Sequence, residues 1–226
     1  AMWHRRLGEA CYNMGDLDMA QRELSAAVAG LDSGQAPGAI LQRLGGGAAR
    51  SLLGAAEAVG SQLVRLVGMS PTVVDDPVER HRLREASLAA ERLAQTYFFL
   101  NQQNRCFVTS LQTAFFAERL GPSAELARSY AVLNVAFGYV PMPRVVERYG
   151  RRAEEIADQV GDGHAVGFVA FLRGLVAIGA GQHAQARAFL KRALATATRN
   201  GDVRSAQEIH PVLAHAHNCA GMFDEA

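Results

Sequence analysis

The chain has 226 residues, of which 49% are hydrophobic, and its 23 basic and 22 acidic side chains leave a net charge of +1. This hydrophobic content excludes a disordered chain, and the length suffices to bury a core, either as one domain or as one run of repeats. The balanced charge gives no general basic field, so we expect neither a nucleic acid partner nor binding to anionic lipid.

The three cysteines, Cys11, Cys106 and Cys219, are far apart and form neither a CxxC pair nor a disulfide framework, which favours a reducing cytoplasm. Cys11 and Cys106 fall at helix positions that we expect to face the packed interior as inert thiols. The sequence opens without an apolar signal core, and we expect no membrane span. Both ends are typical of an excised piece of a larger protein, because residues 221–226 resemble the start of a further helix.

Residues 1–30 predict a helical hairpin with its turn at Gly15-Asp16. Glycine takes the left-handed conformation that ends a helix more readily than other residues do. Small residues at Gly8 and Ala20 fall where the two helices must approach closely. The second helix carries an apolar face at helical spacing, which is made by Leu24, Ala27 and Val28.

This hairpin resembles a tetratricopeptide repeat (TPR). The family pattern combines a bulky residue, Leu-Gly, an aromatic residue, Gly-Asp and two alanines at set distances, and it is met by Trp3, Leu7, Gly8, Tyr12, Gly15, Asp16, Ala20 and Ala27. The bulky residue falls one place early, because His4 stands at the family's position. The resemblance implies stacked antiparallel helix pairs with a binding role, and it says little about the ligand.

Residues 31–77 interrupt this pattern. A loop at residues 32–38 precedes a glycine-rich and mostly apolar stretch, residues 39–69, which predicts a divergent helical connector. Gly45-Gly46-Gly47 lacks the Lys-Ser/Thr of a phosphate-binding loop, so it is weak evidence for nucleotide binding. The simplest interpretation is a long helix packed on its neighbours. The alternative is an amphipathic segment that meets a partner domain or a membrane, although its basic residues are too few to favour the membrane.

Residues 78–226 carry turn residues at a fixed interval. Gly121, Gly161 and Gly201 are evenly spaced, and the residues that divide those intervals are Pro141, Gly181 and Gly221. The period, about 40 residues, lies in the range of roughly 20–50 residues that indicates stacked structural units. We therefore predict TPR-like hairpins over this part of the chain, with the last hairpin truncated.

Individual residues in these hairpins support the prediction. Pro77 suits the first turn of a long helix, and Ser123 is suited to cap the start of another. Counted from the turns, the position of Ala27 in the first hairpin corresponds to those of Ala114, Ala153 and Ala193 in the later hairpins. Because a small residue there allows close packing, we expect an all-α fold, a right-handed α-α superhelix of TPR-like hairpins.

Two segments, residues 3–15 and residues 97–127, are more distinctive than a generic repeat. The second contains Tyr97-Phe98-Phe99 and Phe115-Phe116. Together the segments resemble the C-terminal helical-repeat region of large bacterial signalling proteins, in which a class III adenylate/guanylate cyclase domain and an AAA-type or signal-transduction ATPase domain precede the repeats. The resemblance covers most of the chain and implies a regulatory or partner-binding role. It carries over no catalytic residue, because the cyclase aspartates and the ATPase phosphate loop would lie upstream.

Histidines cluster at residues 210–217, and histidine is a natural metal ligand. On a helix only His210 and His217 share a face, and we expect no carboxylate or cysteine at i+4 to complete a set. Ordinary helix-surface histidines are therefore expected, with no metal and no cofactor. The adjacent carboxylates at 154–155 and 75–76 diverge on a helix, so we expect no acid–base dyad and no enzyme activity in this chain.

Residues 164–180 form the most apolar predicted helix, and Arg173 is its one charged residue. One face carries Phe168, Phe171, Leu175 and Ile178, and the other faces carry Val166, Val169, Leu172 and Val176. A helix that is apolar all round is expected to be buried all round. Two hypotheses remain open: either this helix packs against residues 39–69, or its face is an apolar groove for another helix or a ligand.

In stacked hairpins the first helix of each pair lines the concave face. This predicts groove residues Arg5, Glu9, Tyr12, Asn13, Arg92, Thr96, Phe99, Phe168, Phe171 and Leu175. The preferred function is a non-catalytic scaffold that binds a protein partner or upstream domains of the same polypeptide, anchored by aromatic side chains. The alternative is a small-molecule-sensing regulatory domain that controls an upstream ATPase or cyclase.

Overall fold

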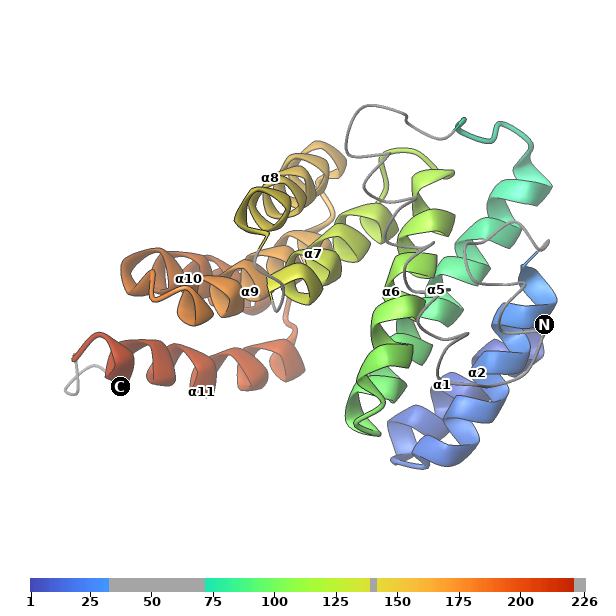
Figure 1. Ribbon diagram of the computed structural model, residues 1–226, viewed down its shortest axis with the longest axis horizontal. Helices are drawn as coiled ribbons and strands as arrows, with labels where there is room; N and C mark the ends of the chain where they lie inside the picture. The colour runs from blue at the N-terminus through green and yellow to red at the C-terminus, as the bar shows by residue number, and fades with distance from the viewer. Residues whose placement is uncertain (33–71, 139–141, 222–226) are drawn as a thin grey trace. The chain divides into compact units, whose positions relative to one another are not determined.

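A computed structural model describes residues 1–32, 72–138 and 142–221, and this part of the chain folds into α-helices joined by turns, with no strand (Figure 1). The predicted all-α class is therefore confirmed. The predicted connector at residues 39–69 and the breaker Pro141 lie outside the described residues. None of the described helices has the length and hydropathy of a membrane span.

The chain divides into two compact units, which are Ala1–Gly121 and Pro122–Ala226. The first unit contains two helical hairpins, formed by α1 (Met2–Met14) with α2 (Leu17–Leu31) and by α5 (Pro77–Phe99) with α6 (Gln103–Glu118). Helix α2 also packs on α5 (Figure 1). The two hairpins of this unit are therefore stacked through one helix from each.

The second unit continues the same alternation of helix and turn. Its helices are α7 (Ala124–Gly138), α8 (Pro143–Val160), α9 (Gly163–Gly179), α10 (His183–Arg199) and α11 (Val203–Cys219). Helices α7 and α8 form one hairpin, and α9 and α10 form the next. Helix α9 packs on both α7 and α8, and α11 packs on α10.

Short polar side chains cap the starts of several helices. Aspartates accept backbone N–H bonds at the starts of α2, α5, α9 and α11, and these are Asp16, Asp76, Asp162 and Asp202. Ser123 caps α7 as predicted, since its Oγ accepts the N–H of Leu126 at 3.2 Å. Pro77 stands in the first turn of α5, also as predicted. These caps satisfy N–H groups that have no partner within their own helix.

Turn residues recur at even spacing along the chain. The left-handed conformation, with φ between 67° and 76°, is adopted by Gly121, Gly161, Gly181, Gly201 and Gly221. This confirms the predicted breakers that fall within the described residues. Asn101, which lies one interval of the series before Gly121, adopts the same conformation with φ 56°. Asparagine tolerates this region better than most residues, so the regular series of turns begins one turn earlier than the glycines alone indicate.

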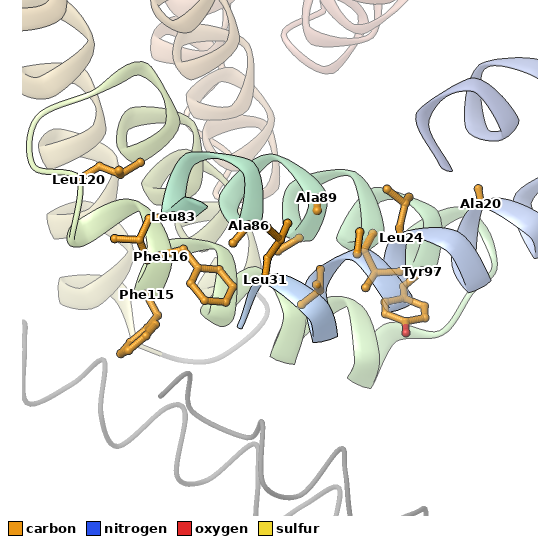
Figure 2. Close-up of a cluster of buried hydrophobic side chains, with 14 of the residues drawn as sticks. Ala20, Leu24, Leu31, Leu83, Ala86, Ala89, Tyr97, Phe115, Phe116 and Leu120 are labelled. Carbon is orange, nitrogen blue, oxygen red and sulfur yellow. The ribbon is translucent and has the colours of Figure 1, made fainter. Parts of the chain in front are cut away.

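The core of the first unit lies between α2, α5 and α6. Figure 2 shows Leu24, Tyr97 and Phe116 among the side chains that gather there. Alanines line the face of α5 that these side chains meet, and Ala86 and Ala89 are fully buried. Each fully buried Leu or Phe contributes about 1.5–3 kcal/mol relative to exposure. In the second unit, one core cluster is formed by α9, α10 and α11, and α7 and α8 bury further large side chains, among them Phe137 and Tyr149.

Glycine meets leucine where the two helices of a hairpin cross. A Cβ on Gly8 of α1 would lie 2.6 Å from Cγ of Leu24 in α2, and a Cβ on Gly174 of α9 would lie 2.7 Å from Cγ of Leu190 in α10. Both leucines are fully buried, and the sequence separation between glycine and leucine is the same in the two pairs. The two hairpins therefore pack in the same internal register.

Other positions share this register. Gly15 and Gly181, which follow the first helix of each hairpin, both have positive φ. The buried alanines Ala20 and Ala27 of α2 correspond to Ala186 and Ala193 of α10, and all four have no exposed surface. Ala114 and Ala153 are also fully buried. The four alanines that the sequence analysis predicted at this position are thus all buried, although Ala114 lies one residue further from the turn residue Asn101 than Ala27 and Ala193 lie from Gly15 and Gly181.

Replacing Gly174 by Ala is expected to lower the free energy of unfolding by about 1–3 kcal/mol, because overpacking against Leu190 outweighs a gain in helix propensity of about 1 kcal/mol. Gly167 on the same helix is the matched control, since its added Cβ would meet Cγ2 of Thr196 at an ordinary 3.5 Å. Gly167→Ala is expected to be neutral or slightly stabilising. Urea denaturation followed by circular dichroism measures both, and equal losses would contradict the packing argument.

The cap of α11 makes stability depend on pH. Asp202 accepts the backbone N–H of Ser205 at 3.0 Å and its hydroxyl at 2.7 Å. These hydrogen bonds, with a smaller contribution from His164, lower the pKa of Asp202. Because folding depresses the pKa of Asp202, the cap contributes fully to the stability of the fold when the pH is above the ordinary pKa of aspartate. This stabilisation is lost as the pH falls through the depressed value.

Asp202→Ala is expected to cost about 1 kcal/mol at neutral pH, the usual loss for a helix cap. Asp202→Asn keeps a capping oxygen but carries no titrating proton, so it should match the wild type at neutral pH and keep its cap in acid. Denaturation at neutral pH and at about pH 3 compares the three proteins. An Asn variant that loses as much stability in acid as the wild type would disprove this assignment.

Candidate partner-binding surface

Aromatic side chains from α1 and α5 meet on one surface of the first unit. The ring centroids of Tyr12 and Phe99 are 6.1 Å apart, and those of Phe98 and Phe99 are 5.6 Å apart. The guanidinium of Arg92 lies over the Tyr12 ring at 4.6 Å, a cation–π contact. We call Tyr12, Arg92, Phe98 and Phe99 the aromatic surface. Sequence analysis predicted Tyr12, Arg92 and Phe99 as groove residues, but it missed Phe98.

The aromatic surface is unusually open to solvent. Phe98 and Phe99 are each 62% exposed, and Tyr12 is half-buried. Arg92 is also held in place from its own helix, because its Nη1 donates to Oε1 of Gln95 at 2.7 Å. A shallow hollow of about 310 Å³ lies at the adjoining turn and is lined by residues 101–105. The aromatic surface thus combines exposed apolar rings with one positioned cation.

Arg5 is occupied by contacts within the unit. Its Nε lies 2.6 Å from Oε2 of Glu85 on α5, and its Nη1 lies 2.8 Å from Oε2 of Glu9. Only 12% of the Arg5 side chain and 9% of the Glu85 side chain are exposed. Burial by itself would lower the pKa of Arg5, but the bonds and charges of Glu85 and Glu9 outweigh it and raise the pKa. We therefore assign Arg5 and Glu9 to the packing of α1 on α5.

Two other predicted groove residues differ from each other in exposure. Thr96 has no exposed surface, and its hydroxyl donates to the carbonyl oxygen of Arg92 at 2.9 Å. It therefore lies beneath the surface that Arg92 and Phe99 form, because a short side chain bonded to its own helix cannot reach outward. Asn13 is exposed at the end of α1.

The predicted apolar face of α9 belongs to the second unit. Its fully buried residues are the small or β-branched ones, namely Ala165, Val169, Ala170, Gly174 and Ala177. Phe168, Phe171 and Leu175 are only half-buried, so the expectation of burial all round is wrong for the largest side chains. The reason is that close contact with neighbouring helices selects the small residues for the inner face. Phe171 and Ile178 pack at the edge of the core formed by α9, α10 and α11.

An ion network joins three helices of the second unit and was missed from the sequence. Arg173 of α9 contacts Glu147 at 3.0 Å and Glu154 at 3.3 Å, both on α8. Arg192 of α10 contacts Asp158 at 2.7 Å and Glu154 at 3.7 Å. Burial raises the pKa of Glu154 despite these two arginines. The available signal was Arg173 itself, the one charge on an otherwise apolar helix.

The histidine and cysteine predictions are partly wrong. His210 is exposed as expected, but His217 is buried, with 5% of its surface exposed. A cysteine does stand at i+4 from a histidine, since Nε2 of His215 lies 3.5 Å from Sγ of Cys219. Cys11 is buried and Cys106 packs against the core, as expected, and burial raises the pKa of the Cys106 thiol. Among the described residues, no three metal-binding side chains come together.

No protein-family model matches the sequence, and no curated protein matches it significantly.

Arg5→Met is expected to destabilise the first unit by about 2–3 kcal/mol, because it leaves the Glu85 carboxylate buried without its cation. This loss is smaller than the roughly 3–5 kcal/mol expected when one partner of a fully buried ion pair is removed, since both side chains retain some access to water. Adding Glu85→Gln should recover part of the loss. Arg151→Ala, which breaks an exposed pair with Glu155, serves as control and should change stability by less than about 0.5 kcal/mol. A similar loss for both arginines would refute a structural role for Arg5.

Proposed function

We propose that this chain is a non-catalytic helical-repeat scaffold that binds a segment of a protein partner or of an upstream domain in the same polypeptide. The hairpins are proposed to be TPR-like and to stack as a right-handed superhelix. The shared register of α1–α2 and α9–α10 supports this, because both hairpins place glycine, leucine and two alanines at the same internal positions. Repeated hairpins of this kind create extended surfaces suited to binding.

The aromatic surface is the single observation that carries the proposal. Two adjacent phenylalanines with 62% exposure are an uncommon use of apolar side chains in a monomer. Tyrosine and arginine are enriched among the residues that dominate binding energy. Tyr12 and Arg92 supply both types here, in direct contact with each other.

Preorganisation favours binding by this surface. Arg92 is fixed by the Tyr12 ring and by Gln95, so little side-chain entropy remains to be lost when a partner arrives. The rings of Phe98 and Phe99 meet edge to face, with an interplanar angle of 79°. A partner with an apolar anchor would cover these rings, and a carbonyl or carboxylate would meet the guanidinium.

The resemblance to repeat regions of bacterial cyclase–ATPase proteins suggests what such a contact would control. In this proposal, binding at the aromatic surface changes the output of catalytic domains in a larger bacterial signalling protein. We prefer protein binding to small-molecule sensing because Phe171 and Ile178, the centre of the alternative site, pack against their own core.

The proposal is tested with a displayed library of random peptides selected against the whole chain. Bound peptides are expected to carry aromatic or aliphatic anchors, and Phe99→Ala should weaken them at least about tenfold, equivalent to about 1.4 kcal/mol of binding energy. Isothermal titration calorimetry measures the affinities. Since Phe99 is largely exposed, its replacement should leave the melting temperature nearly unchanged.

Trp3→Ala is the matched control. Trp3 is 82% exposed, the highest value among the large apolar side chains that the structure describes. At about 100° per residue, its place on α1 lies on the opposite side of that helix from Tyr12. Its replacement should not affect peptide affinity. If Trp3→Ala weakens binding while Phe99→Ala and Tyr12→Ala do not, the aromatic surface is not the binding site.

A further inference from the structure

The last turn of α11 presents an exposed imidazole and an exposed thiol side by side. His215 and Cys219 stand at i and i+4 on the helix, so they share one face. Nε2 of His215 and Sγ of Cys219 are 3.5 Å apart, and both side chains are exposed. The pair lies outside the aromatic surface and plays no part in the proposed function.

The separation of these two atoms suits a shared metal ion. Tetrahedral zinc sites have Zn–S distances of about 2.3 Å and Zn–N distances of about 2.0–2.1 Å, which place the two ligand atoms about 3.5 Å apart. The observed 3.5 Å matches that spacing without any movement of the helix. Sulfur and imidazole nitrogen are also the ligand types that Zn²⁺ prefers.

The position in the helix adds a favourable field. Cys219 is the final residue of α11, where unpaired carbonyl groups form the negative end of the helix dipole. A cation bound beside this turn is stabilised by that field. Because both side chains are exposed, they can also bind a metal ion without first leaving the packed interior.

We propose that His215 and Cys219 form a two-point binding site for a soft divalent cation, with Zn²⁺ as the expected ion. On binding, the thiol of Cys219 releases its proton to water as the Zn–S bond forms, and neutral His215 donates its Nε2 lone pair. Water fills the remaining coordination positions. The bound ion links two successive turns and so stabilises the end of α11.

Cobalt(II) provides the direct test, since a cobalt–thiolate bond absorbs in the near ultraviolet. The reduced whole chain, titrated with Co²⁺, is expected to develop this band with one ion per chain, and Zn²⁺ is expected to abolish it. Zn²⁺ alone should raise the melting temperature, by an amount that grows with the logarithm of the free Zn²⁺ concentration once this exceeds the dissociation constant. Cys219→Ser should remove the band, and His215→Ala should weaken binding at least about tenfold.

His210→Ala and Cys106→Ser are the matched controls, because His210 is exposed on the same helix and Cys106 is a second thiol outside it. Both should leave the titration unchanged. Circular dichroism confirms that each variant keeps its helix content. The proposal is overturned if the wild type gives no thiolate band, if the band survives in Cys219→Ser, or if His215→Ala binds as tightly as the wild type.

Discussion

Close approach of paired helices is the constraint on which both units depend. Where α1 crosses α2 and where α9 crosses α10, a glycine leaves just enough room for a fully buried leucine. Fully buried alanines such as Ala27 and Ala193 extend the same contact along each hairpin. Because interiors pack without spare volume, these small residues fix the register of each pair and thereby the side of each helix that faces solvent.

Much of the fold follows from spacing in the sequence. The evenly spaced glycines, the cap at Ser123 and the first-turn Pro77 all have the local roles predicted for them. Such features depend on backbone conformation a few residues at a time, so a single sequence reveals them. The left-handed conformation of Asn101 was not predicted, because asparagine adopts it only in some contexts.

Side-chain partners were harder to predict, since they depend on contacts between distant residues. Tyr12 and Arg92 were both placed in the groove, but only the packing of α1 against α5 shows that the guanidinium covers the ring. Arg5 was placed there too, although it is engaged by Glu85, which is far from it in the sequence. For α9, hydropathy alone favoured its large side chains as the interior, whereas the geometry of close packing selected Ala170 and Gly174.

The even spacing of left-handed turn residues sets limits on how this sequence can change in length. Each residue added to a helix turns the following side chains by about 100°. A single insertion in α9 before Gly174 would therefore turn Gly174 away from Leu190. Gain or loss of a whole repeat period, by contrast, leaves each remaining helix with the same side turned toward its partner helix. Variation among proteins built in this way should therefore come in complete hairpins, with single-residue gaps confined to the turns.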